Sequence, residues 1–240
     1  MVQAAVAEVP AEADAVAKST WNMDSIATIG ICFVPLILIT AVLLAVCKKL
    51  TAGSALISIL SGLAAIIPIA VIQFFLLSLP IFSSTKLVSV FLTAVLFNGL
   101  IEETIKMLML MIIPGKKKDA ATFVICSLIA GFSIGTFETV VYMLMYGTEA
   151  IILRYATAVL IHTFCSGLSG LYVWTFKQKK QYIRPFIAAV FIHGLYNFFA
   201  GFVYPLKAFS FVTIIYAAIR LKFSYDRIFS DEQNIQLTNK

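Results

Sequence analysis

Residues 121–146 read ATFVICSLIAGFSIGTFETVVYMLMY, an apolar run in which Glu138 is the one charged side chain. A helix needs about 20 predominantly apolar residues to cross the hydrocarbon core of a bilayer. We therefore predict a transmembrane helix over this run. A charged group inside such a helix costs about 2.5–3.5 kcal/mol on insertion scales, so Glu138 is expected to have a function or a partner.

Similar apolar runs fill most of the chain. Of its 240 residues, 61% are hydrophobic and 12% are charged, whereas a soluble domain carries about 25% charge. The runs that fit a membrane span lie near residues 26–46, 55–79, 87–113, 121–146, 154–176, 184–203 and 206–221. The fold class is thus predicted to be all-α, a polytopic membrane bundle of about seven transmembrane helices.

The basic residues predict how this bundle is oriented. They follow the first, third, fifth and seventh runs, at 48–49, 116–118, 177–184 and 220–227. Because cytoplasmic loops carry the excess of lysine and arginine, we expect the N-terminus outside and the C-terminus in the cytoplasm. The predicted parts are a short extracytoplasmic tail over 1–24, a transmembrane bundle over 25–222 and a cytoplasmic tail over 223–240.

The net charge of +6 is spread over these short loops and forms no basic face for nucleic acid. We expect an integral, multi-pass protein of the cell membrane whose surroundings are the lipid bilayer. Five ionisable groups lie inside its apolar runs: Glu102, Glu103, Glu138, His162 and His193. From the helical rise of 1.5 Å per residue, all five are expected between the midplane and the outer half of the membrane, where they can meet.

Two short motifs contain most of these groups. In the E-E-x-x-K motif at 102–106, helical spacing puts Lys106 within reach of both Glu102 and Glu103. Such a pair of carboxylates suits general acid–base catalysis, although a structural ion pair is the competing interpretation. In H-G-L-Y-N at 193–197, His193 and Asn197 lie on one helix face and could stabilise an oxyanion.

These motifs together resemble the PrsW family of intramembrane proteases, which is related to the CAAX-prenyl-protease and bacteriocin-processing (CPBP) group. The resemblance covers about 85–205 and rests on E-E-x-x-K, on G-F-x-x-G-x-x-E ending at Glu138, on Arg154 followed by His162, and on H-G-L-Y-N. One departure is Thr139, where the family commonly has asparagine. Gly131 and Gly135 of the second motif are expected to allow close helix approach.

The resemblance implies hydrolysis of a peptide bond in a membrane-embedded or membrane-tethered protein. It implies Glu103 as the base that activates water, with Glu102 and Lys106 tuning it and Arg154 in support. It also implies His193 and Asn197 as the oxyanion site, and His162 as a group that positions water or binds metal. The protease core is then expected at about 85–205.

The residues do not decide whether the predicted protease binds a metal. His162, His193 and Glu138 would make a three-ligand zinc site with an open position. H-E-x-x-H is absent, however, and water activated by a glutamate needs no metal. A glutamate protease and a zinc protease are therefore both compatible with the sequence.

Three other functions compete with this prediction. A rhomboid-like serine protease could use Ser169 of G-x-S-G with His193 as its base, but it leaves the glutamates unexplained. A proton-coupled transporter or channel could use the buried Glu/His set as a proton relay, although the two halves show no inverted repeat. A non-catalytic scaffold or immunity protein would not need the full set of polar residues.

Overall fold

The computed structural model describes residues 23–79, 86–115, 118–148, 151–180 and 182–238, and all regular elements in these ranges are helices. The first are α2 (Met23–Val46), α3 (Ala52–Leu77), α4 (Leu87–Leu92), the π-helical η3 (Thr93–Gly99), α5 (Leu100–Leu110) and α6 (Ala120–Tyr146). The others are α7 (Ile151–Arg154), the π-helical η4 (Tyr155–Val159), α8 (Leu160–Lys177), α9 (Arg184–Ala200), the 3₁₀ turn η5 (Leu206–Ala208) and α10 (Phe209–Thr238). The predicted all-α class is confirmed.

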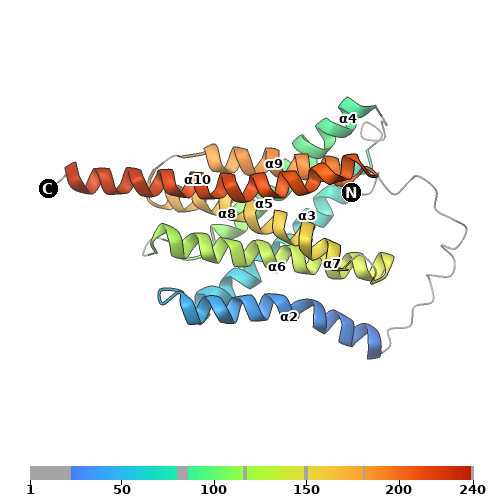
Figure 1. Cartoon of the computed structure of the whole chain (residues 1–240), viewed down its shortest axis with the longest axis horizontal. Coiled ribbons are helices and arrows are strands. Elements are labelled where there is room, and N and C mark those ends of the chain that lie inside the picture. Colours follow the sequence, from blue (N-terminus) through green and yellow to red (C-terminus); the bar gives the residue numbers. More distant parts are fainter. Residues whose placement is uncertain (1–22, 80–85, 116–117, 149–150, 181, 239–240) are drawn as a thin grey trace, which may run out of the picture.

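The long helices run side by side along one axis, with α3 crossing them obliquely and α4 projecting outward at one end (Figure 1). Helix α6 is central, because 78% of its apolar window is buried, against 17% for the peripheral α2. Five helical stretches of the described chain are long and apolar enough to span a membrane: 27–46, 52–76, 87–110, 120–145 and 151–177. The two remaining predicted spans are α9, which has 17 residues, and α10, so the count of seven and the orientation stay predictions.

The C-terminal helix is longer than the membrane span that hydropathy predicts, and the predicted cytoplasmic tail stays a prediction. We expected a span over 206–221 followed by a cytoplasmic tail, whereas α10 continues as one helix to Thr238. The charged residues after 219 end the apolar run, but charge does not end a helix. No glycine or proline follows Pro205, so the sequence contains none of the usual helix breakers there. The predicted N-terminal tail falls almost entirely in residues 1–22, outside the described part of the chain.

Glycines set the closest helix crossings, as expected for membrane helices. A Cβ on Gly131 of α6 would lie 2.6 Å from the Cβ of Ser166 in α8, and one on Gly135 would lie 2.6 Å from the Cα of Val159. A Cβ on Gly99 would likewise lie 2.6 Å from the carbonyl oxygen of Val190 in α9. Only glycine lets these backbones approach so closely, which brings the polar residues of α5, α6, α8 and α9 together.

Two helical stretches contain a π-helical turn just before their polar residues. The π-helical turns η3 and η4 lead directly into α5 and α8, so each lies within one turn of Glu102 or His162. A π turn shifts the side chains beyond it around the helix axis relative to those before it, and such turns are frequent at functional sites.

Candidate functional site

The Lys106 ammonium is the centre of a buried polar cluster built from helices distant in sequence. It lies 2.7 Å from Glu103 Oε1, 2.9 Å from His162 Nδ1 and 3.3 Å from His193 Nδ1. Lys106 is 1% exposed, and these groups come from α5, α8 and α9. The E-E-x-x-K motif and the two histidines predicted to meet therefore do meet.

Glu103 is enclosed on all sides. Its side chain is 0% exposed, and its Oε1 faces both Lys106 and His193 Nδ1, the latter at 2.8 Å. Its Oε2 accepts a hydrogen bond of 2.8 Å from the Ser169 hydroxyl. Both carboxylate oxygens are thus engaged by protein groups, and a buried carboxylate is stable only with such partners.

Glu138 forms a second ion pair at the edge of the cluster. Its Oε1 lies 3.1 Å from Arg154 Nη2, and its Oε2 accepts a hydrogen bond from His162 Nε2. The Arg154 guanidinium also lies over the ring of Tyr142, with Cζ 3.6 Å from the ring centroid. Arg154 and His162 thereby connect the glutamate of α6 to the histidine of α8.

Glu102 differs from the other two glutamates in its partners. Its Oε1 accepts a hydrogen bond of 2.9 Å from Gln73 Nε2 of α3, and its Oε2 lies 3.4 Å from His193 Nε2. Its side chain is 10% exposed, whereas that of Glu103 is fully buried. The contact of Glu102 with His193 is an ion pair only when the His193 ring is doubly protonated, whereas Lys106 and Arg154 pair with the other two carboxylates.

These contacts indicate the tautomers of both rings. Lysine is a donor only, so His162 Nδ1 accepts from Lys106 and His162 Nε2 carries the proton that Glu138 accepts. His193 Nδ1 is closer to Glu103 than to Lys106, which favours an Nδ1–H that donates to Glu103. The Nε2 lone pair of His193 then faces Glu102.

The donor set for a metal is only partly the one expected from the sequence. Ligand-type atoms of Glu102, His162 and His193 all lie within 4.8 Å of one another, so Glu102 joins the two histidines in this group. Two histidines and a carboxylate fit a catalytic zinc site. There is one condition: Lys106 and Glu138 engage both ring nitrogens of His162, so one of these hydrogen bonds must open before His162 can bind a metal.

Asn197 and Ser169 are the other two residues that the sequence suggests for catalysis, one for the oxyanion and one as a serine nucleophile. Asn197 lies one turn beyond His193 on α9, and its Oδ1 is buried without a hydrogen-bond partner in the described part of the chain. Ser169 is fully buried and donates to Glu103, while His193 contacts the glutamates. This arrangement does not favour a serine–histidine pair.

Gln73 is the site residue that sequence reasoning missed. It is the one amide within the apolar stretch 62–79, and this isolated polarity was the signal that could have revealed it. Gln73 brings α3 into the site, which was expected to lie wholly within about 85–205.

Comparison with known proteins agrees with the motifs. The family model described as "PrsW family intramembrane metalloprotease" matches residues 50–221, well over half of the chain. No curated protein matches the chain, and neither does any solved structure.

Proposed function

Because the chain belongs to the PrsW family of intramembrane metalloproteases and is an integral multi-pass membrane protein, we propose that it hydrolyses a peptide bond of a membrane-embedded or membrane-tethered protein. One observation carries the proposal: glutamates, histidines and a lysine from α5, α6, α8 and α9 form a single hydrogen-bonded cluster in the bundle interior. Buried ionisable groups are expensive in a membrane and typically mark a functional site.

Glu102 is the group we propose as the base that takes a proton from water. Glu103 was expected in that role, but its two oxygens already accept from Lys106, His193 and Ser169. A general base must approach the proton that it abstracts to within hydrogen-bonding distance. Glu102, whose side chain is 10% exposed, meets this requirement better than the fully buried Glu103, which serves to orient His193 and to balance the charge of Lys106.

Asn197 and His193 are the groups we propose for the oxyanion. The Asn197 amide can donate from Nδ2, and His193 can donate from Nε2 once both of its ring nitrogens are protonated. Preorganised donors of this kind, in a site with little water, supply a large part of the barrier reduction in acyl transfer.

A metal, if bound, would be held by Glu102, His193 and His162, the donor set present in the cluster. It would polarise the water or the substrate carbonyl as a Lewis acid. His193 distinguishes the two mechanisms, because a metal needs the Nε2 lone pair whereas an oxyanion needs an Nε2–H. Metal analysis of the purified protein, with cleavage measured across a chelator titration, decides between them: chelator-resistant cleavage by metal-free protein excludes the zinc mechanism.

The proposed function is tested by co-expressing the protein with a single-span reporter and comparing Glu102→Gln with Glu103→Gln. We expect Glu102→Gln to lower cleavage at least about 100-fold at unchanged thermal stability, the usual effect of removing a general base. Glu103→Gln should lower cleavage and stability together, because it leaves Lys106 without its closest partner.

A matched control is Asp226→Asn, which neutralises an exposed carboxylate paired with Lys222 and should cleave normally. Normal cleavage by Glu102→Gln would overturn the proposed base. Loss of cleavage in a Glu103→Gln protein of wild-type stability would return that role to Glu103.

A further inference from the structure

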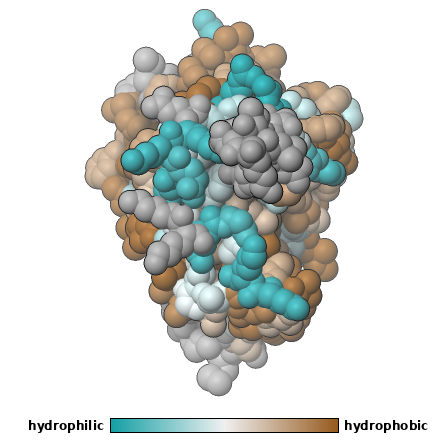
Figure 2. Space-filling model, turned by 90° about the vertical axis from the view of Figure 1, so that its left-hand side faces the viewer, coloured by the Kyte–Doolittle hydropathy of each residue, from teal (hydrophilic) through white to brown (hydrophobic). Residues whose placement is uncertain are grey.

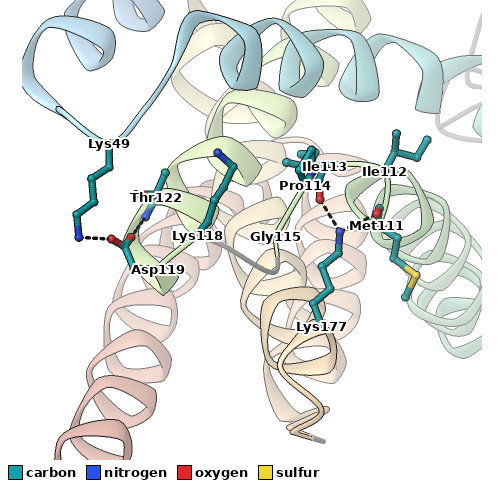
Figure 3. A pocket seen from close by; sticks show the side chains of 10 residues that line it. All are labelled: Lys49, Met111, Ile112, Ile113, Pro114, Gly115, Lys118, Asp119, Thr122 and Lys177. Carbon is teal, nitrogen blue, oxygen red and sulfur yellow. Dashed lines mark hydrogen bonds and ion pairs between the residues drawn. The ribbon is translucent and has the colours of Figure 1, made fainter.

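An open cavity of about 930 Å³ lies at one end of the bundle, away from the polar cluster. It is formed where the α2–α3 loop, the segment after α5 and the ends of α6 and α8 meet (Figure 3). Hydrophilic side chains gather among hydrophobic ones on this end of the molecule (Figure 2). It is the end that the basic loops predict to face the cytoplasm.

Three lysines from three separate segments line the cavity: Lys49, Lys118 and Lys177. Among the described residues of the lining, Asp119 is the one acidic side chain, so these residues together carry a net charge of +2. Lysine ammonium groups bind phosphate oxygens as point charges, and a positively charged lining attracts an anion. The charge therefore favours a phosphate group as ligand.

The lining is held in place by side chains of α8 and α3. Trp174 Nε1 donates to the Lys118 carbonyl at 2.9 Å, and Lys177 Nζ donates to the carbonyl of Met111 at 2.7 Å and to that of Ile113. Lys118 Nζ donates to Ser54 Oγ at 2.7 Å. These bonds hold the backbone at Met111, Ile113 and Lys118, so this part of the cavity wall is a built feature of the fold.

Two of the lysines retain donors for a ligand. An ammonium has three N–H groups. Among the described residues, Lys49 uses one for Asp119, at 2.6 Å, and Lys118 uses one for Ser54. Both can therefore donate to an additional anionic oxygen without losing their present bonds.

The remaining wall of the cavity is apolar and faces the membrane boundary. Met111, Ile112, Ile113 and Pro114 follow directly after the span that ends at residue 110, and the Ile112 side chain is 63% exposed. A ligand with a phosphate on one side and hydrocarbon on the other matches this lining. The volume is also within the range of about 300–1,000 Å³ typical of small-ligand sites.

We propose that this cavity binds the phosphate of an anionic phospholipid headgroup, with Lys49 and Lys118 contacting the phosphate and Ile112 contacting the lipid chain. The site is separate from the proposed active site, and its test requires no proteolysis.

The test uses the full chain in a neutral detergent and counts bound lipids by native mass spectrometry. Phosphatidylglycerol should bind at least tenfold more tightly than phosphatidylcholine. Lys49→Gln and Lys118→Gln should each weaken phosphatidylglycerol about fivefold, because one lysine near an anionic headgroup contributes about 1 kcal/mol. The matched control is Lys222→Gln, an exposed lysine on α10 that does not line the cavity, and it should change the affinity less than twofold.

A variant that binds the lipid more tightly than wild type would support the proposal in a way that misfolding could not imitate. Asp119→Asn removes the negative charge from the lining and retains a side chain that can cap α6, so it should bind phosphatidylglycerol several-fold more tightly. Equal binding of the two lipids, or equal losses in Lys118→Gln and Lys222→Gln, would overturn the proposal. If inorganic phosphate binding is weakened by the same lysine variants while the two lipids bind equally, the ligand of the cavity is free phosphate and not a lipid headgroup.

Discussion

Replacing Lys106 by methionine tests the centre of the polar cluster. The change keeps much of the side-chain volume and removes the ammonium that contacts Glu103, His162 and His193. Glu103 is then a fully buried carboxylate without its cation. Breaking a buried ion pair by removing one partner costs about 3–5 kcal/mol, since the remaining charge is uncompensated. We expect Lys106→Met to be destabilised by this amount.

A double-mutant cycle isolates the ion pair from other effects. In Lys106→Met combined with Glu103→Gln the uncompensated charge is gone, so the double variant should be more stable than Lys106→Met alone. It will not recover fully, because His162 Nδ1 still lacks the donor that faced it. We expect a coupling free energy of at least about 2 kcal/mol between the two positions.

The assay is reversible unfolding in mixed micelles, followed by tryptophan fluorescence and by helicity. Lys222→Met is the matched control: its ammonium lies 2.8 Å from Asp226, but both side chains are exposed. Such a surface pair contributes about 0–1 kcal/mol. A coupling below about 0.5 kcal/mol, or a loss in Lys106→Met no larger than that in Lys222→Met, would refute the buried ion pair.

Three further predictions concern the helix crossing, the α6 cap and the serine. Gly131→Ala places a Cβ against α8 and should cost about 1–3 kcal/mol in unfolding experiments, whereas Gly30→Ala meets open space and should stabilise α2 slightly. Asp119→Ala should lose about 0.5–2 kcal/mol, because the Asp119 side chain accepts from the backbone N–H of Thr122 at 2.8 Å. Partial burial raises the pKa of Asp119, but hydrogen bonds from Lys49 and Thr122 outweigh it and lower this pKa to about 2. Its contribution should therefore be complete above about pH 4 and disappear as the pH falls towards 2, which an acid titration of stability in wild type and Asp119→Asn would measure. Ser169→Ala removes a hydrogen bond to Glu103, so cleavage should fall but persist; complete loss in a stable protein would instead support a serine mechanism.

The helices were largely predictable from the sequence. Apolar runs of about 20 residues predict the positions of α2, α3, α6 and the helical stretches 87–110 and 151–177, because a membrane span must be long and apolar. The extent of α10 was not predictable in this way. Hydropathy measures where a span ends, whereas a helix ends at a breaker or a cap, and residues 206–238 contain no proline or glycine.

The membership of the site was predictable in part. Helical spacing put Lys106 next to the glutamate pair, and the cost of buried charge indicated that Glu138, His162 and His193 would have partners. Spacing gives no information on contacts between helices. Gln73 was therefore missed, and the ion pair of Glu138 with Arg154 could not be assigned.

The sequence by itself determined that this is a membrane helix bundle and which ionisable residues it must keep out of lipid. The tertiary structure alone decided which partners each of these residues has and how deeply each is buried. Glu102 and Glu103 are adjacent and chemically identical, yet Glu102 contacts Gln73 and is 10% exposed, while Glu103 is fully enclosed by Lys106, His193 and Ser169. Their environments differ because glycines let α6, α8 and α9 approach closely on particular sides, and burial and hydrogen bonding depend on those approaches rather than on residue type.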